Sequence, residues 1–142
     1  MRTFSIIALW GCAITFSLSS CSAKKHINIT SSKWQLLSVR SGESEEFLTP
    51  SEDRKPVTFS LSNEETVSGY AGCNGYSGKA EVKKQKITFS NLISMRMFCF
   101  DGMEIEYALL NALRLVDNYE VRNRTLLLKQ DSVLLATFIP LQ

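Results

Sequence analysis

The residues whose spacing most suggests chemistry lie in one glycine-rich stretch, from Gly69 to Gly78. Four of the seven glycines fall here, at every third residue, around Cys73 and the pair Asn74-Gly75. Glycine tolerates positive φ and close backbone approach, so this density implies a tightly bent chain. A P-loop needs four residues between its glycines and then Gly-Lys-Ser/Thr, but here Gly72 and Gly78 enclose five residues and an alanine follows the lysine. The stretch predicts a cysteine-bearing hairpin with a type I′ turn at Asn74-Gly75, and no nucleotide site.

The other residues able to do nucleophilic or acid–base chemistry lack suitable partners. His26 is the only histidine and precedes the folded part, so we expect no Ser-His or Cys-His site. Glu104 and Glu106 could act as an acid/base pair, but on a helix they project about 200° apart and cannot share one substrate. Cys73 could act as a nucleophile only with a free thiol. We therefore expect no catalytic residues and no enzyme.

Two groups of residues could bind a metal ion. Met95 and Met97 carry the soft thioether ligands that copper(I) prefers, but no histidine is available to complete a site, and methionine routinely fills core gaps. Segment 42–55 carries carboxylates suited to calcium, without the order of an EF-hand loop. Its acidic residues are Glu43, Glu45, Glu46, Glu52 and Asp53. We expect methionines in the core, an exposed acidic loop, and no metal or other cofactor.

The first twenty residues are typical of an export signal: a basic start, an apolar run over 4–16, and small residues before Cys21. The apolar run is shorter than the roughly 20 residues that a transmembrane helix needs. Leu18-Ser19-Ser20-Cys21 resembles the lipobox of bacterial lipoproteins. That resemblance implies cleavage before Cys21 and acylation of its sulfur and amine with fatty acids such as palmitate. We expect a signal peptide at 1–20 and a lipid-anchored tether at 21–32; in the alternative, an ordinary signal peptide, Cys21 is incidental.

Export changes both the number of charged residues in the mature chain and the chemistry expected of its cysteines. Only Arg2 of the 16 basic residues is removed with the signal, which leaves 15 beside 14 acidic residues. A net charge near +1 gives no reason to expect nucleic-acid binding or strong attraction to anionic lipid. Once Cys21 is acylated, Cys73 and Cys99 remain, and an oxidising periplasm favours a disulfide between them. Chain-entropy arguments value this bond at roughly 3 kcal/mol.

The rest of the chain alternates in the manner of short strands. Residues 57–62 place apolar and polar side chains in turn, and residues 133–139 are apolar on both faces, which indicates a central strand. Further strands are expected at 33–39, 66–70, 79–82, 86–92, 119–121 and 125–130. Segment 94–100 is apolar except for Arg96, and we expect it to cross the core and carry Cys99 towards Cys73.

One helix interrupts the strands. Asp101 is a suitable N-cap, and Glu104 three residues later completes a capping box. Six apolar residues then recur along one face: Ile105, Ala108, Leu109, Ala112, Leu113 and Val116. Such a stripe packs on a sheet. Together these elements predict an α+β domain at 33–142, with an antiparallel, partly barrel-like sheet of about seven or eight short strands packed on one α-helix.

Several motifs stand in a recognisable order. Trp34-Gln35-Leu36 opens the domain, a strand led by Pro56 follows, and then comes Gly69-x-x-Gly72-Cys73-Asn74 with Tyr76 and Gly78. Met95-Arg96-Met97-Phe98-Cys99 precedes a helix that carries Glu106 and Leu113. With these motifs residues 34–138 resemble the META domain family, which includes HslJ-like bacterial lipoproteins. The family's Thr-x-Met-Ala-Cys has Met95 and Phe98 at its Thr and Ala positions here, and Gly75 stands where a larger residue is usual.

The resemblance implies a small, partly barrel-like α+β fold. META domains are associated with envelope lipoproteins, some heat-inducible and linked to tolerance of hydrophobic drugs, without established catalytic activity. We therefore expect a monomeric, non-enzymatic outer membrane lipoprotein facing the periplasm, which acts by binding or assembly in envelope stress or drug tolerance. The fold is also similar to the cracked barrel of type III secretion pilotins. The alternative function is accordingly a carrier of an acyl chain or other apolar ligand.

Overall fold

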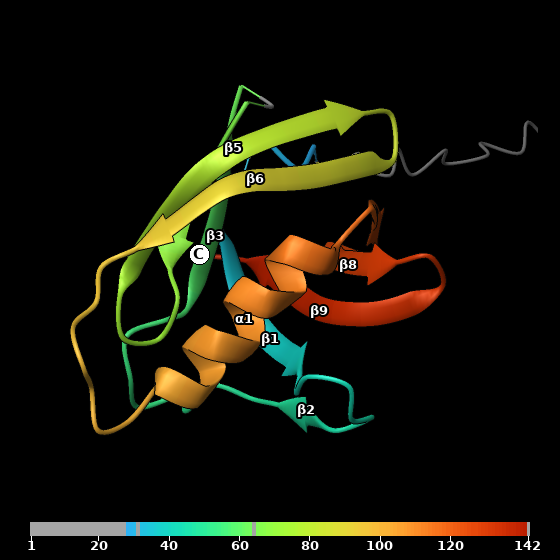
Figure 1. Ribbon diagram of the computed structural model, residues 1–142. Helices are drawn as coiled ribbons and strands as arrows, with labels where there is room; N and C mark the ends of the chain where they lie inside the picture. Colours follow the sequence, from blue (N-terminus) through green and yellow to red (C-terminus); the bar gives the residue numbers. More distant parts are fainter. Residues whose placement is uncertain (1–27, 31, 64, 142) are drawn as a thin grey trace, which may run out of the picture.

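Nine strands and one helix make up the part of the chain that the computed structural model describes, residues 28–30, 32–63 and 65–141 (Figure 1). The first five strands are β1 (Trp34–Arg40), β2 (Phe47–Leu48), β3 (Thr58–Ser62), β4 (Thr66–Tyr70) and β5 (Gly75–Lys83). Then follow β6 (Lys86–Ser94), α1 (Met103–Leu115), β7 (Asn118–Arg122), β8 (Thr125–Gln130) and β9 (Val133–Pro140).

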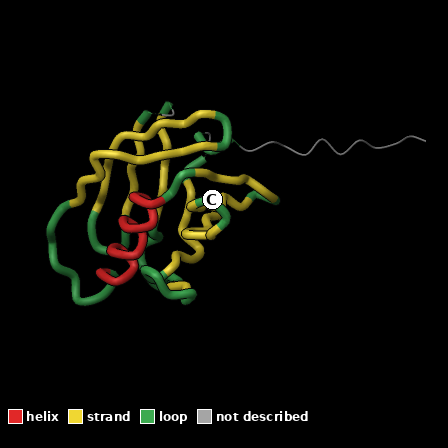
Figure 2. Tube along the Cα trace, turned by 45° about the vertical axis from the view of Figure 1, so that its right-hand side comes forward, coloured by secondary structure: helices red, strands yellow, loops and turns green. Residues whose placement is uncertain are grey.

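The strands form one antiparallel sheet that closes into an uneven ring. The order is β2-β1-β3-β4-β5-β6-β7-β8-β9, and β1 also pairs with β9. β6 and β7 share a single residue pair, Lys86 with Asn118, so the strand pairing around the ring is least extensive between them. Helix α1 packs against β6 and β1 (Figures 1 and 2). The α+β class, the single helix and the partly barrel-like sheet are therefore confirmed.

The alternation read from the sequence corresponds to the inside and outside of this ring. Phe59 and Leu61 of β3 are buried, whereas Ser60 between them is partly exposed. β9 lies between β8 and β1, which confirms the prediction that it is a central strand. The expected acidic loop is exposed but contains the short strand β2, which pairs with the end of β1.

The helix buries the predicted apolar stripe but begins differently from the prediction. Ala108, Leu109, Ala112 and Leu113 are buried, and Arg114 lies in the last turn. The N-cap is Gly102 in the left-handed conformation, with no side-chain cap, so the predicted cap at Asp101 is wrong; the Asp101 side chain pairs with Arg54 instead. A Cβ atom on Gly102 would lie 2.5 Å from the Gly72 carbonyl oxygen, so contact with the glycine-rich loop sets the helix entry.

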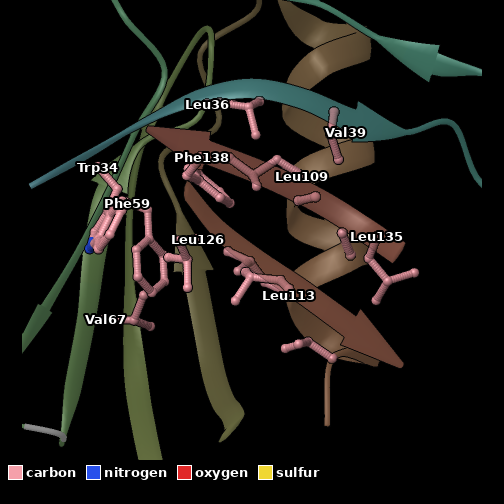
Figure 3. Close-up of a cluster of buried hydrophobic side chains, with 14 of the residues drawn as sticks. Trp34, Leu36, Val39, Phe59, Val67, Leu109, Leu113, Leu126, Leu135 and Phe138 are labelled. Atoms are coloured by element: carbon pink, nitrogen blue, oxygen red, sulfur yellow. The ribbon is translucent and has the colours of Figure 1, made fainter. Parts of the chain in front are cut away.

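The core fills the space inside the ring (Figure 3). Trp34, Phe59 and Phe138 have no exposed surface, and the centroids of the Phe59 and Phe138 rings are 5.5 Å apart. Ile29, which falls in the predicted tether, is 1% exposed and accepts a hydrogen bond from Trp34 Nε1 at 2.9 Å. The described end of that segment is thus packed on the domain.

Candidate functional site

The glycine-rich stretch forms the end of the β4–β5 hairpin. Tyr70 pairs with Gly75, so the connection is the four-residue loop from Ala71 to Asn74. The predicted type I′ turn at Asn74-Gly75 is wrong, since it needs positive φ at both residues and only Gly72, at φ 124°, has it in this described loop. A Cβ atom on Gly72 would lie 2.8 Å from the Gly102 carbonyl oxygen. Packing on the turn before the helix therefore shapes the loop.

Asn74 connects this loop to the helix and to the segment before it. Its main-chain N–H donates to Glu106 Oε2 at 2.7 Å, and its side-chain Nδ2 donates to Glu106 Oε1 at 3.0 Å. Nδ2 also donates to the Met97 carbonyl at 3.0 Å, while Asn74 Oδ1 accepts from the Met97 N–H at 3.2 Å. Asn74 and Glu106 are 1% and 3% exposed. A buried carboxylate is tolerated only with such hydrogen bonds, so Glu106 has a structural place here.

A disulfide between Cys73 and Cys99 reinforces the same junction, as predicted. The two Cα atoms are 5.7 Å apart, within the usual range for a disulfide. Cys73 is buried, and its sulfur lies 3.3 Å from the Met97 carbonyl oxygen. Neither cysteine presents a free thiol. The disulfide and Asn74 together hold the backbone of the segment between β6 and α1 at two adjacent points.

The side chains of this held segment point outward, so its predicted path through the core is wrong. Five residues, which we call the apolar ridge, are exposed over more than half of their surface. They are Ile93 (67%), Met95 (58%), Met97 (57%), Phe98 (83%) and Phe100 (94%). The predicted core methionines are thus surface residues. Beyond Ser94 the segment has no regular period, and its main-chain contacts with Asn74 leave its side chains facing solvent.

An open groove of about 840 Å³, which we call the sheet groove, lies on one side of the apolar ridge. Ile93, Met95 and Met97 line one end of it. A row of hydroxyls, Ser60, Ser68 and Ser77, crosses β3, β4 and β5 in register along it. Lys33 and Lys55 also line the groove, and Lys55 Nζ lies 4.1 Å from the centre of the Tyr70 ring. No acidic residue lines this groove in the described chain.

A second groove of about 590 Å³, the helix groove, separates the ridge from α1. Leu92 and Ile93 of β6 face Tyr107 and Leu110 of the helix across it. Arg96 and Arg114 also line it, and neither forms an ion pair with a described residue. Glu106 is its one acidic residue, already bound to Asn74. Both grooves therefore combine apolar walls with cations that form no ion pair with a described residue.

In the described chain, the pKa shifts of Tyr76 and Glu120 each have a structural cause. Burial raises the pKa of the Tyr76 phenol, whose hydroxyl donates to the Thr58 carbonyl at 3.0 Å. A hydrogen bond from Lys129 lowers the pKa of Glu120. Glu120 lies on β7 and Lys129 on β8, and neither residue lines either groove. Within residues 28–30, 32–63 and 65–141 there is no group of three or more His, Cys, Asp or Glu side chains that could hold a metal ion.

Comparison with known proteins gives one family and two structural relatives. The family described as "META domain" matches this chain over residues 27–140. The chain belongs to the META domain family. An NMR structure of a protein from Burkholderia xenovorans is 31% identical, with a TM-score of 0.67 over 80% of this chain and 84% of that one. A second NMR structure is 20% identical, with a TM-score of 0.62 over 79% of this chain and 91% of that one, and shows the fold alone. Curated proteins give no match.

Six of the META motif residues that the structure describes meet at one junction of the fold. Gly72, Cys73, Asn74, Met97, Cys99 and Glu106 join the hairpin loop, the ridge and the helix. Gly69 lies against the Thr58 carbonyl and Gly78 against Leu92, in each case too close for a Cβ atom. Trp34 stands apart from them in the core. The sequence motif thus marks structural residues, while the exposed ridge was missed because its apolar composition indicated burial.

Two predicted features concern the N-terminal segment of this META protein. The proposed lipidation site Cys21 and the lone histidine, His26, lie outside the described residues. In the described part of the chain, no helix is both long and apolar enough to cross a bilayer.

Proposed function

We propose that this META protein is a non-enzymatic lipoprotein of the cell envelope, HslJ-like in kind, anchored through Cys21 and acting by binding. The observation that carries the proposal is the apolar ridge, held rigid by a disulfide and by Asn74 between two cation-lined grooves. The disulfide and the hydrogen bonds of Asn74 fix the backbone of this segment, while its phenylalanine and methionine side chains are exposed. Such a surface is suited to contact with another molecule.

The described side chains that could do chemistry support a binding role over catalysis. Cys73 and Cys99 are bonded to each other, and Glu106 accepts hydrogen bonds from Asn74. Tyr76 donates its hydroxyl proton to a main-chain carbonyl. Each of these groups is committed to a structural contact, so none is poised to attack or to exchange protons with a substrate.

The anchor is tested by fractionation of cells that produce the protein and its Cys21→Ala variant. The wild-type chain should stay with the outer membrane under high salt, and its mass should show acyl chains on residue 21. The variant should wash off, since a lipid anchor resists salt and an electrostatic contact does not. Retention of the variant in high salt would refute the lipoprotein proposal, and Cys12→Ala serves as the matched control.

A second candidate function, carriage of an acyl chain or other apolar ligand, is favoured by the sheet groove alone. The groove offers an apolar end at Met95 and Met97 and two cations, Lys33 and Lys55, for an anionic head. The ring interior offers less, since large side chains fill it. Native mass spectrometry of the oxidised protein with added fatty acid tests this function. A bound adduct that is lost in Lys55→Gln would support carriage, and no adduct at all would exclude it.

We further propose, from the resemblance to META lipoproteins, a role in envelope stress or drug tolerance. Cells lacking the gene should become more sensitive to heat or to hydrophobic drugs, and a Phe98→Ser, Phe100→Ser chain should fail to restore tolerance. Full restoration of tolerance by that variant would show that tolerance does not depend on the apolar ridge. We expect the working form to be a monomer, which sedimentation of the purified domain tests.

A further inference from the structure

The apolar ridge has the composition of a lipid-contacting surface. Phe98 and Phe100 flank the disulfide-bonded Cys99, and both are more than four-fifths exposed. They protrude from a segment whose backbone is held in place, so they cannot fold back into the core without losing those bonds. Proteins that rest on a bilayer insert such apolar side chains about 5–10 Å into the boundary between headgroups and acyl chains.

Cations surround this ridge on both sides. Lys33 and Lys55 line the sheet groove, and Arg96 and Arg114 line the helix groove. Glu106 is the one acidic residue of the described chain that lines either groove, and its carboxylate is buried and turned towards Asn74. Asp101 pairs with Arg54, close to Asp53, and Glu104 in the first helical turn lines neither groove. The small net charge of the whole chain conceals this local excess. Cations close to a surface are attracted to anionic headgroups.

We propose that the apolar ridge and the four cations beside it form a docking surface for an anionic lipid bilayer. The two grooves share Ile93, Met95 and Met97, so the cations and the ridge make one continuous surface. A second copy that docks through the same surface is a poor occupant, because its own cations would meet these cations. The inference rests on the proposed function only in that an anchored Cys21 brings a membrane near.

The start of the described chain is compatible with this orientation. Six residues lie between Cys21 and Asn28, the first residue described, and the seven residue-to-residue steps from one to the other span at most about 25 Å. Lys33, immediately before β1, lines the sheet groove. The proposal therefore places the anchor and the ridge at the same bilayer surface. The ridge would fix how the domain sits there and would open both grooves towards the headgroups.

Vesicle binding without the anchor tests the docking surface. The protein used is residues 21–142 with Cys21→Ser and the Cys73–Cys99 bond intact; every buried apolar residue of the core, from Ile29 to Phe138, is retained. It should sediment with vesicles of phosphatidylethanolamine and phosphatidylglycerol, more weakly with phosphatidylcholine alone, and less as salt rises. Phe98→Ser with Phe100→Ser should weaken partitioning at least about tenfold, and Lys33→Gln or Lys55→Gln about fivefold each.

The control is Val133→Ser, which changes a 42% exposed apolar residue at the β8–β9 turn and should bind like the parent. The ridge substitutions are on the surface, so the thermal midpoint should stay the same and report an intact fold. As a second readout, Phe98→Trp should emit at shorter wavelength on anionic vesicles and be quenched by brominated lipid.

Three outcomes would overturn the proposal: no sedimentation with anionic vesicles, equal binding by the ridge variant, or an unchanged Phe98→Trp emission in the bound state. Loss of a protein cross-link in cells by the ridge variant, with vesicle binding intact, would assign the ridge to a protein partner instead. The Cys21→Ser protein used in this experiment carries no acyl chain. A negative vesicle result would therefore leave the fractionation result for Cys21 unaffected, and a negative fractionation result would leave the vesicle result unaffected.

Discussion

Asn74 and Glu106 share one buried contact in which the carboxylate accepts hydrogen bonds from both nitrogens of the asparagine, at 2.7 and 3.0 Å. The same asparagine exchanges two hydrogen bonds with the backbone of Met97. One residue thus joins the hairpin loop, the helix and the apolar ridge. Its position next to Cys73 means that the covalent and the hydrogen-bonded links of the junction support each other.

Asn74→Ala should lower the free energy of unfolding by about 3 kcal/mol, because it leaves the buried Glu106 carboxylate with only one hydrogen-bond donor from residue 74. Urea unfolding of the oxidised protein measures this change. Glu104→Gln is the matched control on the exposed side of the helix and should stay within about 0.5 kcal/mol of the wild type. An effect of Asn74→Ala as small as that of the control would show that Glu106 does not depend on this contact.

Removal of the disulfide should also destabilise the domain. Cys73→Ser with Cys99→Ser frees a loop whose ends are separated by 26 residues, and the expected loss is about 3 kcal/mol. The ridge should then become a ready site of protease cleavage in the native state, because only hydrogen bonds such as those of Asn74 to Met97 and of Met95 to Gly75 still hold it. Limited proteolysis followed by mass spectrometry locates the cut. Cleavage at the same rate with and without the disulfide would show that Asn74 is sufficient.

Gly72→Ala should destabilise the protein by about 2 kcal/mol or more, since residue 72 has φ 124° and its Cβ atom would meet the Gly102 carbonyl. Gly42→Ala is a useful comparison, because Gly42 also has positive φ, at 56°, but has open space around it. It should cost about 1 kcal/mol. The difference between the two thermal midpoints therefore reports the contact between the loop and the helix entry.

The pair Glu120 and Lys129 should make a small contribution to stability that depends on pH. Because Lys129 lowers the pKa of Glu120 in the folded state below its usual 4.5, the contribution is present above that pH and is lost as pH falls through the folded pKa. Lys129→Met should therefore be less stable than the wild type at neutral pH, and the gap should narrow in acid and in high salt. A gap that is constant with pH would assign the loss to packing of the lysine stem.

Patterns within single elements could be read from the sequence. The alternation around Phe59 and the helical stripe from Ala108 to Leu113 each predict a buried face, because regular strand and helix geometry repeats at a fixed period. Pairing of Cys73 with Cys99 followed from the count of cysteines and an exported context. The META motifs led to the right family and, through it, to the ring-like sheet.

Contacts between elements were decided only by the tertiary structure. Gly102 replaces Asp101 as the helix cap because the Gly72 loop packs on it, and Ile29 joins the core because Trp34 binds it. Segment 94–100 illustrates the limit best. It has the composition of a core strand, but it has no period that assigns its side chains to a face. Once Asn74 and the disulfide hold its backbone at the junction, Met97, Phe98 and Phe100 face solvent, and composition alone could not show this.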